Sequence, residues 1–200
     1  MSAKKYELVS LETGKKSTLD ALSGSVGPDC LNIASIGKDH GIFTFDPGFM
    51  ATASCESRIT YIDGDAGVLL YRGYPIEQIA AKSSFLEVSY LLIHGALPSS
   101  RQLEQFDHAI RYHTMLNETL LRFFNGFHYD AHPMAMVSAV VSSMAAFYHD
   151  SMDNHNPRHR EIFAHRILAK IPTIAAASFK HNLGQPFVYP RNDMDYCANM

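Results

Sequence analysis

The chain has 200 residues, with 17 Lys and Arg against 20 Asp and Glu and a formal net charge of -3. Hydrophobic residues make up 46% of it and charged residues only 18%, which excludes intrinsic disorder. This nearly neutral balance gives no long-range attraction to nucleic acid or anionic lipid, so neither is expected as a partner.

The cysteines and the N-terminus indicate a cytoplasmic protein. The three cysteines are far apart and form no C-x-x-C pair, so they suggest neither a zinc site nor a disulfide framework. The first residues include lysines but lack the apolar stretch of a secretory signal. The longest nearly apolar run, 133–148, is shorter than the roughly 20 residues of a membrane span, so no membrane contact is expected.

Residues 1–72 form a β-rich N-terminal segment in our prediction. Turn residues at 35–41 precede a predicted strand at 42–45. Residues 58–62 and 68–71 flank a glycine-rich turn and predict a hairpin. Asp63 in that turn could begin a calcium loop, but the fifth and twelfth positions lack the carboxylates that such a loop needs, which favours a plain turn.

Residues 73–200 have helical patterns and are predicted to begin a large helical domain. Capping residues Ser84, Ser99 and Asn117 precede three of the helices. We expect Pro172 to interrupt one helical stretch, because proline removes a backbone donor. The expected helices are 76–80, 84–94, 99–110, 117–124, 133–148, 158–170, 173–182 and 194–200. Because the last one stops after a single turn, we expect the chain to be a fragment.

No metal site or nucleophile motif is predicted. His149, His155, His159 and His165 lie near one another in sequence, but His159 and His165 are six residues apart on one helix and face different directions. No H-E-x-x-H motif is present, and neither are G-x-S-x-G, G-x-G-x-x-G or Walker sequences. Surface or hydrogen-bonded histidines are the favoured interpretation.

Arg166 and Lys170 are the one unusual cluster. They are four residues apart on a predicted helix, so their side chains lie side by side and repel each other. A diphosphate would relieve that repulsion, since arginine offers a bidentate fork and lysine a point charge. The alternative is a solvated basic face near a helix C-terminus.

Long, rare strings in the order of one family span nearly all of the chain. They include FTFDPGF at 43–49, TASCES at 52–57, YRGYPI at 71–76, HPMA at 132–135, AAFYHDS at 145–151, NPRHRE at 156–161 and GQPFVYPRND at 184–193. In these strings the chain resembles the citrate synthases, specifically the bacterial type II enzymes, which are hexameric and regulated by NADH. The resemblance covers roughly the first half of the family's chain.

The resemblance implies a mainly α-helical citrate synthase fold with a small β-rich N-terminal segment. The family condenses acetyl-CoA with oxaloacetate and water to give citrate and CoA, the entry step of the tricarboxylic acid cycle, without a further cofactor. Its catalytic histidines and aspartate are expected beyond Met200, so the fragment alone is expected to be inactive. The expected assembly is a homodimer, with three dimers forming a hexamer.

The resemblance also implies an allosteric NADH site. The matching positions are His113, Thr114, Tyr148, Arg166, Lys170 and Asn192. One departure is Tyr112, where the best-known relatives carry an arginine; Arg111 lies one residue earlier and, on a helix, points about 100° away.

Two alternatives stay open. One is a 2-methylcitrate synthase-like acyl-CoA condensing enzyme, although the long β-rich segment favours the regulated citrate synthase. The other is a non-catalytic helical nucleotide-binding module that uses the face of Arg166 and Lys170.

Overall fold

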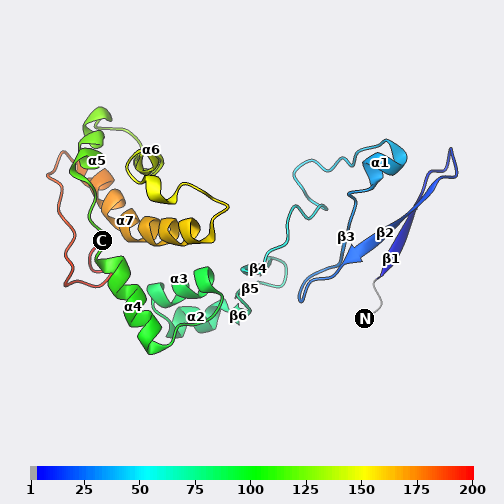
Figure 1. Ribbon diagram of the computed structural model, residues 1–200, viewed down its shortest axis with the longest axis horizontal. Helices are drawn as coiled ribbons and strands as arrows, with labels where there is room; N and C mark the ends of the chain where they lie inside the picture. The colour runs from blue at the N-terminus through cyan, green and yellow to red at the C-terminus, as the bar shows by residue number, and fades with distance from the viewer. Residues whose placement is uncertain (1–3) are drawn as a thin grey trace. The chain divides into compact units, whose positions relative to one another are not determined.

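The computed structural model describes residues 4–200, in which the chain forms two compact units, one ending at Ile79 and the other beginning at Ala80 (Figure 1). The first unit is β-rich and the second is helical, so the predicted mainly helical fold with a β-rich start is confirmed. The boundary falls inside the helix Ile76–Lys82 (α2). A domain boundary after residue 72 stays a prediction.

The N-terminal unit begins with a hairpin that the sequence analysis missed. Strands Lys5–Val9 (β1) and Lys16–Leu22 (β2) pair antiparallel, and Cys30–Leu31 (β3) pairs with β2 at its other edge. Tyr6 lies opposite Leu19, which is the one buried residue of these strands. Because each long strand alternates only two or three apolar residues with polar ones, the two-residue period is weak in the sequence.

The predicted strand at 42–45 is absent, and this prediction is wrong. The turn residues before it instead form a short helix, Ile36–His40 (α1), which Gly41 ends at a φ of 69°. Phe43 and Phe45 are 95% and 91% exposed. The β-branched and aromatic side chains favour extended backbone, but a strand also needs a neighbour, and these residues pair with none.

The second predicted hairpin is confirmed. Thr60–Asp63 (β4) pairs with Val68–Tyr71 (β5), and Tyr74–Pro75 (β6) continues the sheet. In the connecting turn the Asp63 carboxylate accepts the Ala66 amide at 2.9 Å. Asp63 therefore stabilises a plain turn, as the sequence favoured.

In the helical unit, helix starts and stops follow the sequence closely. Phe85–His94 (α3) and Ser100–Arg111 (α4) both begin at complete capping boxes, Ser84 with Glu87 and Ser99 with Gln102. Gly95 ends α3 at a φ of 88°. The signals that begin these helices are local in the sequence, because each capping side chain bonds a backbone amide three residues away.

A hydrophobic core forms where the middle helices meet the last one. Glu118–Arg122 (α5) begins at the Asn117 cap and continues into a 3₁₀ turn, 123–126. Pro133–Ser143 (α6) is shorter than predicted, since 144–146 and 149–151 are separate 3₁₀ turns. The buried core consists of Leu116, Leu120, Leu121, Phe124, Met136, Val140, Met144, Ile174 and Ala177.

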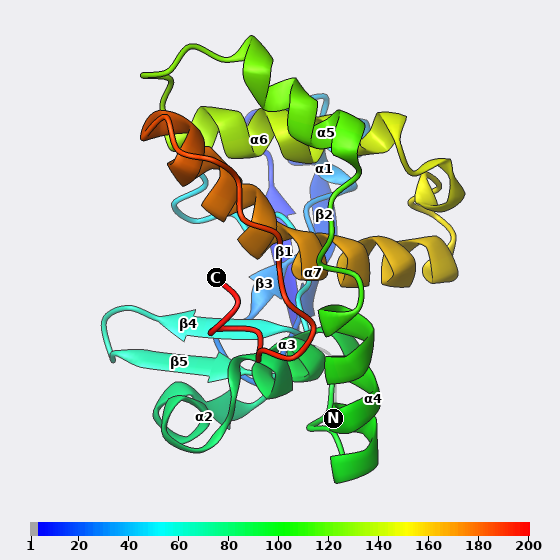
Figure 2. The same cartoon turned by 90° about the vertical axis from the view of Figure 1, so that its left-hand side faces the viewer.

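The last helix, Pro157–Asn182 (α7), is continuous through Pro172, so the predicted interruption is wrong. A proline at 172 leaves the Leu168 carbonyl without its usual amide donor. The Tyr196 hydroxyl takes that place and donates to the Leu168 carbonyl at 2.9 Å. Figure 2 shows the C-terminal segment returning past α7. A distant side chain thus compensates for the missing backbone donor.

The helix predicted at 194–200 is also absent, and these residues form turns. The Asp195 carboxylate accepts the Ala198 amide at 2.7 Å, and the Asn199 side chain bonds both backbone groups of Arg191. Asp and Asn side chains compete with the backbone ladder in this way, which favours turns over helix.

Among the described residues, one helix is long and apolar enough to cross a membrane by length and composition. It is α7, with a mean hydropathy of 1.2 over 18 residues. A core helix of a water-soluble protein meets the same criterion, and α7 packs against α4 and α6.

Candidate functional site

Helix α7 carries the two cations of the candidate site. Asn156 caps its N-terminus and Pro157 occupies its first position, so the helix begins where the sequence predicts. One turn separates Arg166 from Lys170, and both lie over the Tyr148 ring. The Arg166 guanidinium carbon is 4.2 Å from the ring centroid, and Lys170 Nζ is 5.5 Å from it. Both distances suit cation–π attraction.

Arg166 already binds a carboxylate. Its Nη1 and Nη2 donate to the two carboxylate oxygens of Asp150 at 2.9 and 3.0 Å, and Nη1 also donates to the Ser151 hydroxyl at 2.7 Å. This bidentate pair holds the pKa of Asp150 below its ordinary value, chiefly through the hydrogen bond. Asp150 therefore supplies negative charge that the sequence analysis sought in a ligand.

Lys170 is buried, with 6% of its surface exposed, so a solvated basic face does not describe it. Its Nζ donates to the backbone carbonyl of His113 at 2.9 Å and also to that of Met115. Burial, with a smaller contribution from the Arg166 charge, lowers the pKa of Lys170 to about 8. At neutral pH the ammonium is charged and lacks any carboxylate partner among residues 4–200.

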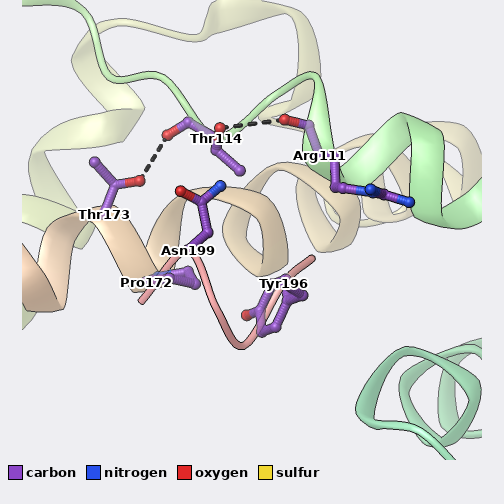
Figure 3. A pocket seen from close by; sticks show the side chains of 6 residues that line it. All are labelled: Arg111, Thr114, Pro172, Thr173, Tyr196 and Asn199. Carbon is purple, nitrogen blue, oxygen red and sulfur yellow. Dashed lines mark hydrogen bonds between the residues drawn. The ribbon is translucent and has the colours of Figure 1, made fainter. Parts of the chain in front are cut away.

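A small cavity lies between the end of α4, α7 and the C-terminal segment, lined by Arg111, Thr114, Pro172, Thr173, Tyr196 and Asn199 (Figure 3). Thr173 donates through Oγ1 to the Thr114 carbonyl at 2.9 Å, and Thr114 Oγ1 donates to the Arg111 carbonyl at 3.2 Å. The cavity volume is about 10 Å³, enough for one water at most. The cavity is therefore too small for a nucleotide.

The structure brings most of the predicted residues together. Tyr148, Arg166 and Lys170 are in contact, and the backbone of His113 and Thr114 joins them through Lys170 and Thr173. Within residues 4–200 no hydrogen bond or ion pair links the Asn192 side chain to these groups, so its place in the site stays a prediction. Sequence reasoning missed Asp150, although it lies inside the AAFYHDS string.

The residues at the end of α4, where Tyr112 lies, are held by local contacts. Tyr112 stacks on His108, with ring centroids 4.2 Å apart, and is 56% exposed. Arg111 pairs with Asp107 on its own helix, so its charge is already engaged. The His113 ring bonds the Ala109 carbonyl at 2.6 Å. The side chains of Arg111, Tyr112 and His113 are thus all engaged in contacts with α4.

A second group of chemically capable side chains lies nearby. His94, Glu161 and His165 place one nitrogen or oxygen atom each within 4.8 Å of one another. Burial lowers the pKa of His165, while the Glu161 charge opposes the shift. The four-residue spacing of Glu161 and His165 was visible in the sequence, but His94 comes from another helix and carried no signal.

The four histidines considered in the sequence analysis, His149, His155, His159 and His165, do not form a common cluster. His159 accepts the Asp153 amide through Nδ1 at 3.3 Å, and His155 is exposed in the loop before α7. Of that set only His165 belongs to the group with His94 and Glu161.

Comparisons of the sequence and the structure with known proteins point to the same family. A model of the family described as "Citrate synthase, C-terminal domain" matches residues 48–200. The chain is similar to the structure of citrate synthase from Pyrobaculum aerophilum, with a TM-score of 0.68 and 31% identity over 76% of this chain and 40% of that one. It is also similar to citrate synthase from Thermotoga maritima MSB8, with a TM-score of 0.66 and 29% identity over 78% and 40%.

A third solved structure shows the likeness of fold alone. It is the ternary complex of carboxymethyl coenzyme A and oxaloacetate with citrate synthase from Thermoplasma acidophilum, with a TM-score of 0.70 and 23% identity, covering 76% of this chain. The chain spans about 40% of the length of each of these three proteins.

Proposed function

The chain belongs to the citrate synthase family, and on that premise we propose that it acts in the condensation of acetyl-CoA with oxaloacetate and water to give citrate and CoA. The single observation that supports this proposal is the family match over residues 48–200. The catalytic histidines and aspartate are proposed to lie outside these 200 residues, in agreement with the lack of any nucleophile motif in the sequence.

The test of this activity uses two acyl donors. The full-length protein should release CoA when supplied with acetyl-CoA and oxaloacetate, whereas residues 1–200 alone should release none above background. With propionyl-CoA, one methylene larger, kcat/KM should fall roughly 10- to 200-fold. A preference for propionyl-CoA would favour the 2-methylcitrate synthase alternative, and CoA release by residues 1–200 would contradict the placement of the catalytic residues.

We further propose that NADH binds over the cluster of Tyr148, Arg166 and Lys170 and inhibits the enzyme allosterically. The cluster offers two adjacent cations for a diphosphate and an aromatic face for the adenine. His113, Thr114 and Asn192 are proposed to complete the site from the turns around it.

This proposal requires an exchange of partners. Arg166 has to release the Asp150 carboxylate, or share it, before its fork can accept phosphate oxygens. Lys170 has to turn at least one N–H from the carbonyls of His113 and Met115 toward the ligand. Asp150 is therefore an internal competitor of the diphosphate, and removing its charge should tighten binding.

NADH titrations at fixed ionic strength test the site. Lys170→Ala should weaken binding roughly 10- to 100-fold, because a charge-assisted contact worth about 1.5–3 kcal/mol is lost. Tyr148→Ala should act in the same direction, while Asp150→Asn and Tyr112→Arg should tighten binding. The matched control is Lys180→Ala, on the same helix but bonded to Gln185.

Two outcomes would contradict the NADH site. One is wild-type affinity in Lys170→Ala together with unchanged affinity in Asp150→Asn. The other is equal weakening by Lys180→Ala, which would indicate only a general charge effect. Catalytic rates without NADH should stay within about twofold in every variant, because a separate site is coupled to the active site only through a free energy of its own.

We also propose that the protein is cytoplasmic and assembles with itself, as a dimer and then as a hexamer of three dimers. The exposed apolar side chains of residues 42–50, which include Phe43, Phe45 and Met50, support burial against other protein. Light scattering of the full-length protein at micromolar concentration measures the assembly. A stable monomer would contradict it.

A further inference from the structure

Two histidines and one glutamate from two helices converge beside the cation cluster. His94 is the last residue of α3, while Glu161 and His165 lie one turn apart on the same face of α7. One ligand atom from each lies within 4.8 Å of the other two.

The donor types match divalent transition-metal ions, among which we choose zinc. Imidazole nitrogens and a carboxylate oxygen suit zinc, which takes two histidines and a glutamate with a water in the fourth position in several enzymes. Tetrahedral bonds of about 2.0–2.1 Å place ligand atoms roughly 3.3 Å apart. The three side chains would therefore move inward by about 1.5 Å at most, and His94 and Glu161 are exposed and able to rotate.

Aromatic side chains contact both rings. The His165 ring lies 5.2 Å from Phe106, and the His94 ring lies 4.2 Å from Tyr90. Within the part of the chain that the structure describes, Glu161 forms no ion pair with lysine or arginine. The neighbouring Arg166 is directed to Asp150 instead.

We propose that His94, Glu161 and His165 bind a zinc ion that joins the end of α3 to α7. Neither helix alone offers more than two of the ligands, so binding links segments 67 residues apart in the sequence. The ion would lie one residue along α7 from Arg166 and add positive charge next to the proposed nucleotide site.

Zinc titration of the full-length protein against a chromophoric chelator tests the site. We expect one tight equivalent per chain in the wild type, and roughly 100-fold or greater loss of affinity in His94→Ala and in Glu161→Gln, since even outer-shell changes cost 10- to 100-fold. Both changes are at exposed positions, so the fold should persist. The matched control is His155→Ala combined with His159→Ala, which removes the neighbouring histidines.

Two further measurements separate this site from loose surface binding. Cobalt substitution should give the intense visible absorption of four-coordinate Co²⁺ in the wild type and not in His94→Ala. Zinc at about a hundredfold excess over Kd should raise Tm by roughly 5–10 °C in the wild type only. Wild-type affinity in His94→Ala and Glu161→Gln, or an equal loss in the His155/His159 control, would overturn the proposal.

Discussion

The two units of the chain differ in how much of their apolar surface they bury. In the helical unit, apolar side chains from five helices form clusters in which Ile110, Leu120 and Phe124 have no exposed surface. Among residues 4–79 of the N-terminal unit, only Leu19, Ile36 and Ile79 are buried. Large apolar side chains stay exposed there instead: Leu11 at 98%, Phe43 at 95%, Phe45 at 91% and Met50 at 87%.

This difference indicates two sources of stability. The helical unit encloses enough apolar surface to hold its own core, whereas the N-terminal unit is held by backbone pairing and surface polar contacts. Its exposed aromatic side chains find no cover within the unit itself, and the predictions below test that division.

The largest effect is expected from a core truncation. Phe124→Ala should lower the free energy of unfolding by about 3–5 kcal/mol, because it opens a cavity in the helical unit. Phe43→Ala, on a side chain that is 95% exposed, should change it by less than about 0.5 kcal/mol. Urea unfolding followed by far-UV circular dichroism measures both. Equal losses would show that Phe43 is buried in the protein in solution.

The buried lysine should make the helical unit more stable at alkaline pH. Its pKa is about 8 in the folded chain and about 10.5 when unfolded, so between these values the unfolded state binds more protons. The contribution of Lys170 to the free energy of unfolding should thus rise by about 2–3 kcal/mol from pH 8 to 10.

Chemical denaturation of wild type and Lys170→Met across that range isolates the effect. The free energy of unfolding of wild type, measured relative to that of Lys170→Met, should rise with pH. The range stops at pH 10 because Tyr196, whose pKa burial raises to about 12, begins to matter above it. Parallel pH profiles of the two proteins would contradict the burial of Lys170.

A smaller effect is expected where α7 passes through Pro172. Tyr196→Phe removes the donor to the Leu168 carbonyl and should cost about 1–2 kcal/mol. In a Pro172→Ala background the restored backbone amide can serve that carbonyl, so Tyr196→Phe should cost much less. A double-mutant cycle by urea unfolding measures the coupling, and additive costs would show that the hydroxyl does not compensate for the proline.

The smallest effect compares caps in the two units. Ser84→Ala removes the capping box of α3 and should cost about 1 kcal/mol. Ser35→Ala precedes α1, where the serine makes no capping bond, and should cost almost nothing. Hydrogen exchange of the first amides of each helix reports the local change. Comparable fraying in both variants would count against the observed caps.

Local signals allowed much of the helical unit to be predicted. Ser84, Ser99 and Asn117 begin helices because each satisfies backbone donors two or three residues away, so a short window contains the whole interaction. The continuity of α7 through Pro172 could not be found this way, because its compensating donor is 24 residues further along. The prediction of a strand at 42–45 was wrong for a similar reason. Whether a segment forms a strand depends on a partner strand that can lie far away in the sequence.

For the candidate site, spacing placed Arg166 and Lys170 on one face but not their surroundings. That Lys170 is buried against the carbonyls of His113 and Met115 depends on how α7 packs against the segment after α4. The Asp150 carboxylate reaches Arg166 across a turn with no regular period. The residues were thus predictable, while their charge state and partners were not.

The hydrogen bond from the Tyr196 hydroxyl to α7 can form only after Tyr196 has been synthesised. On the ribosome, chains grow at about 5–20 residues per second, so Tyr196 is added roughly 1–5 s after Pro172. During that interval the Leu168 carbonyl lacks the hydroxyl that caps it in the finished fold. The middle of α7 is therefore completed only after the chain that follows it has been synthesised, and a pause in translation between the two codons would prolong the time in which this helix is incomplete.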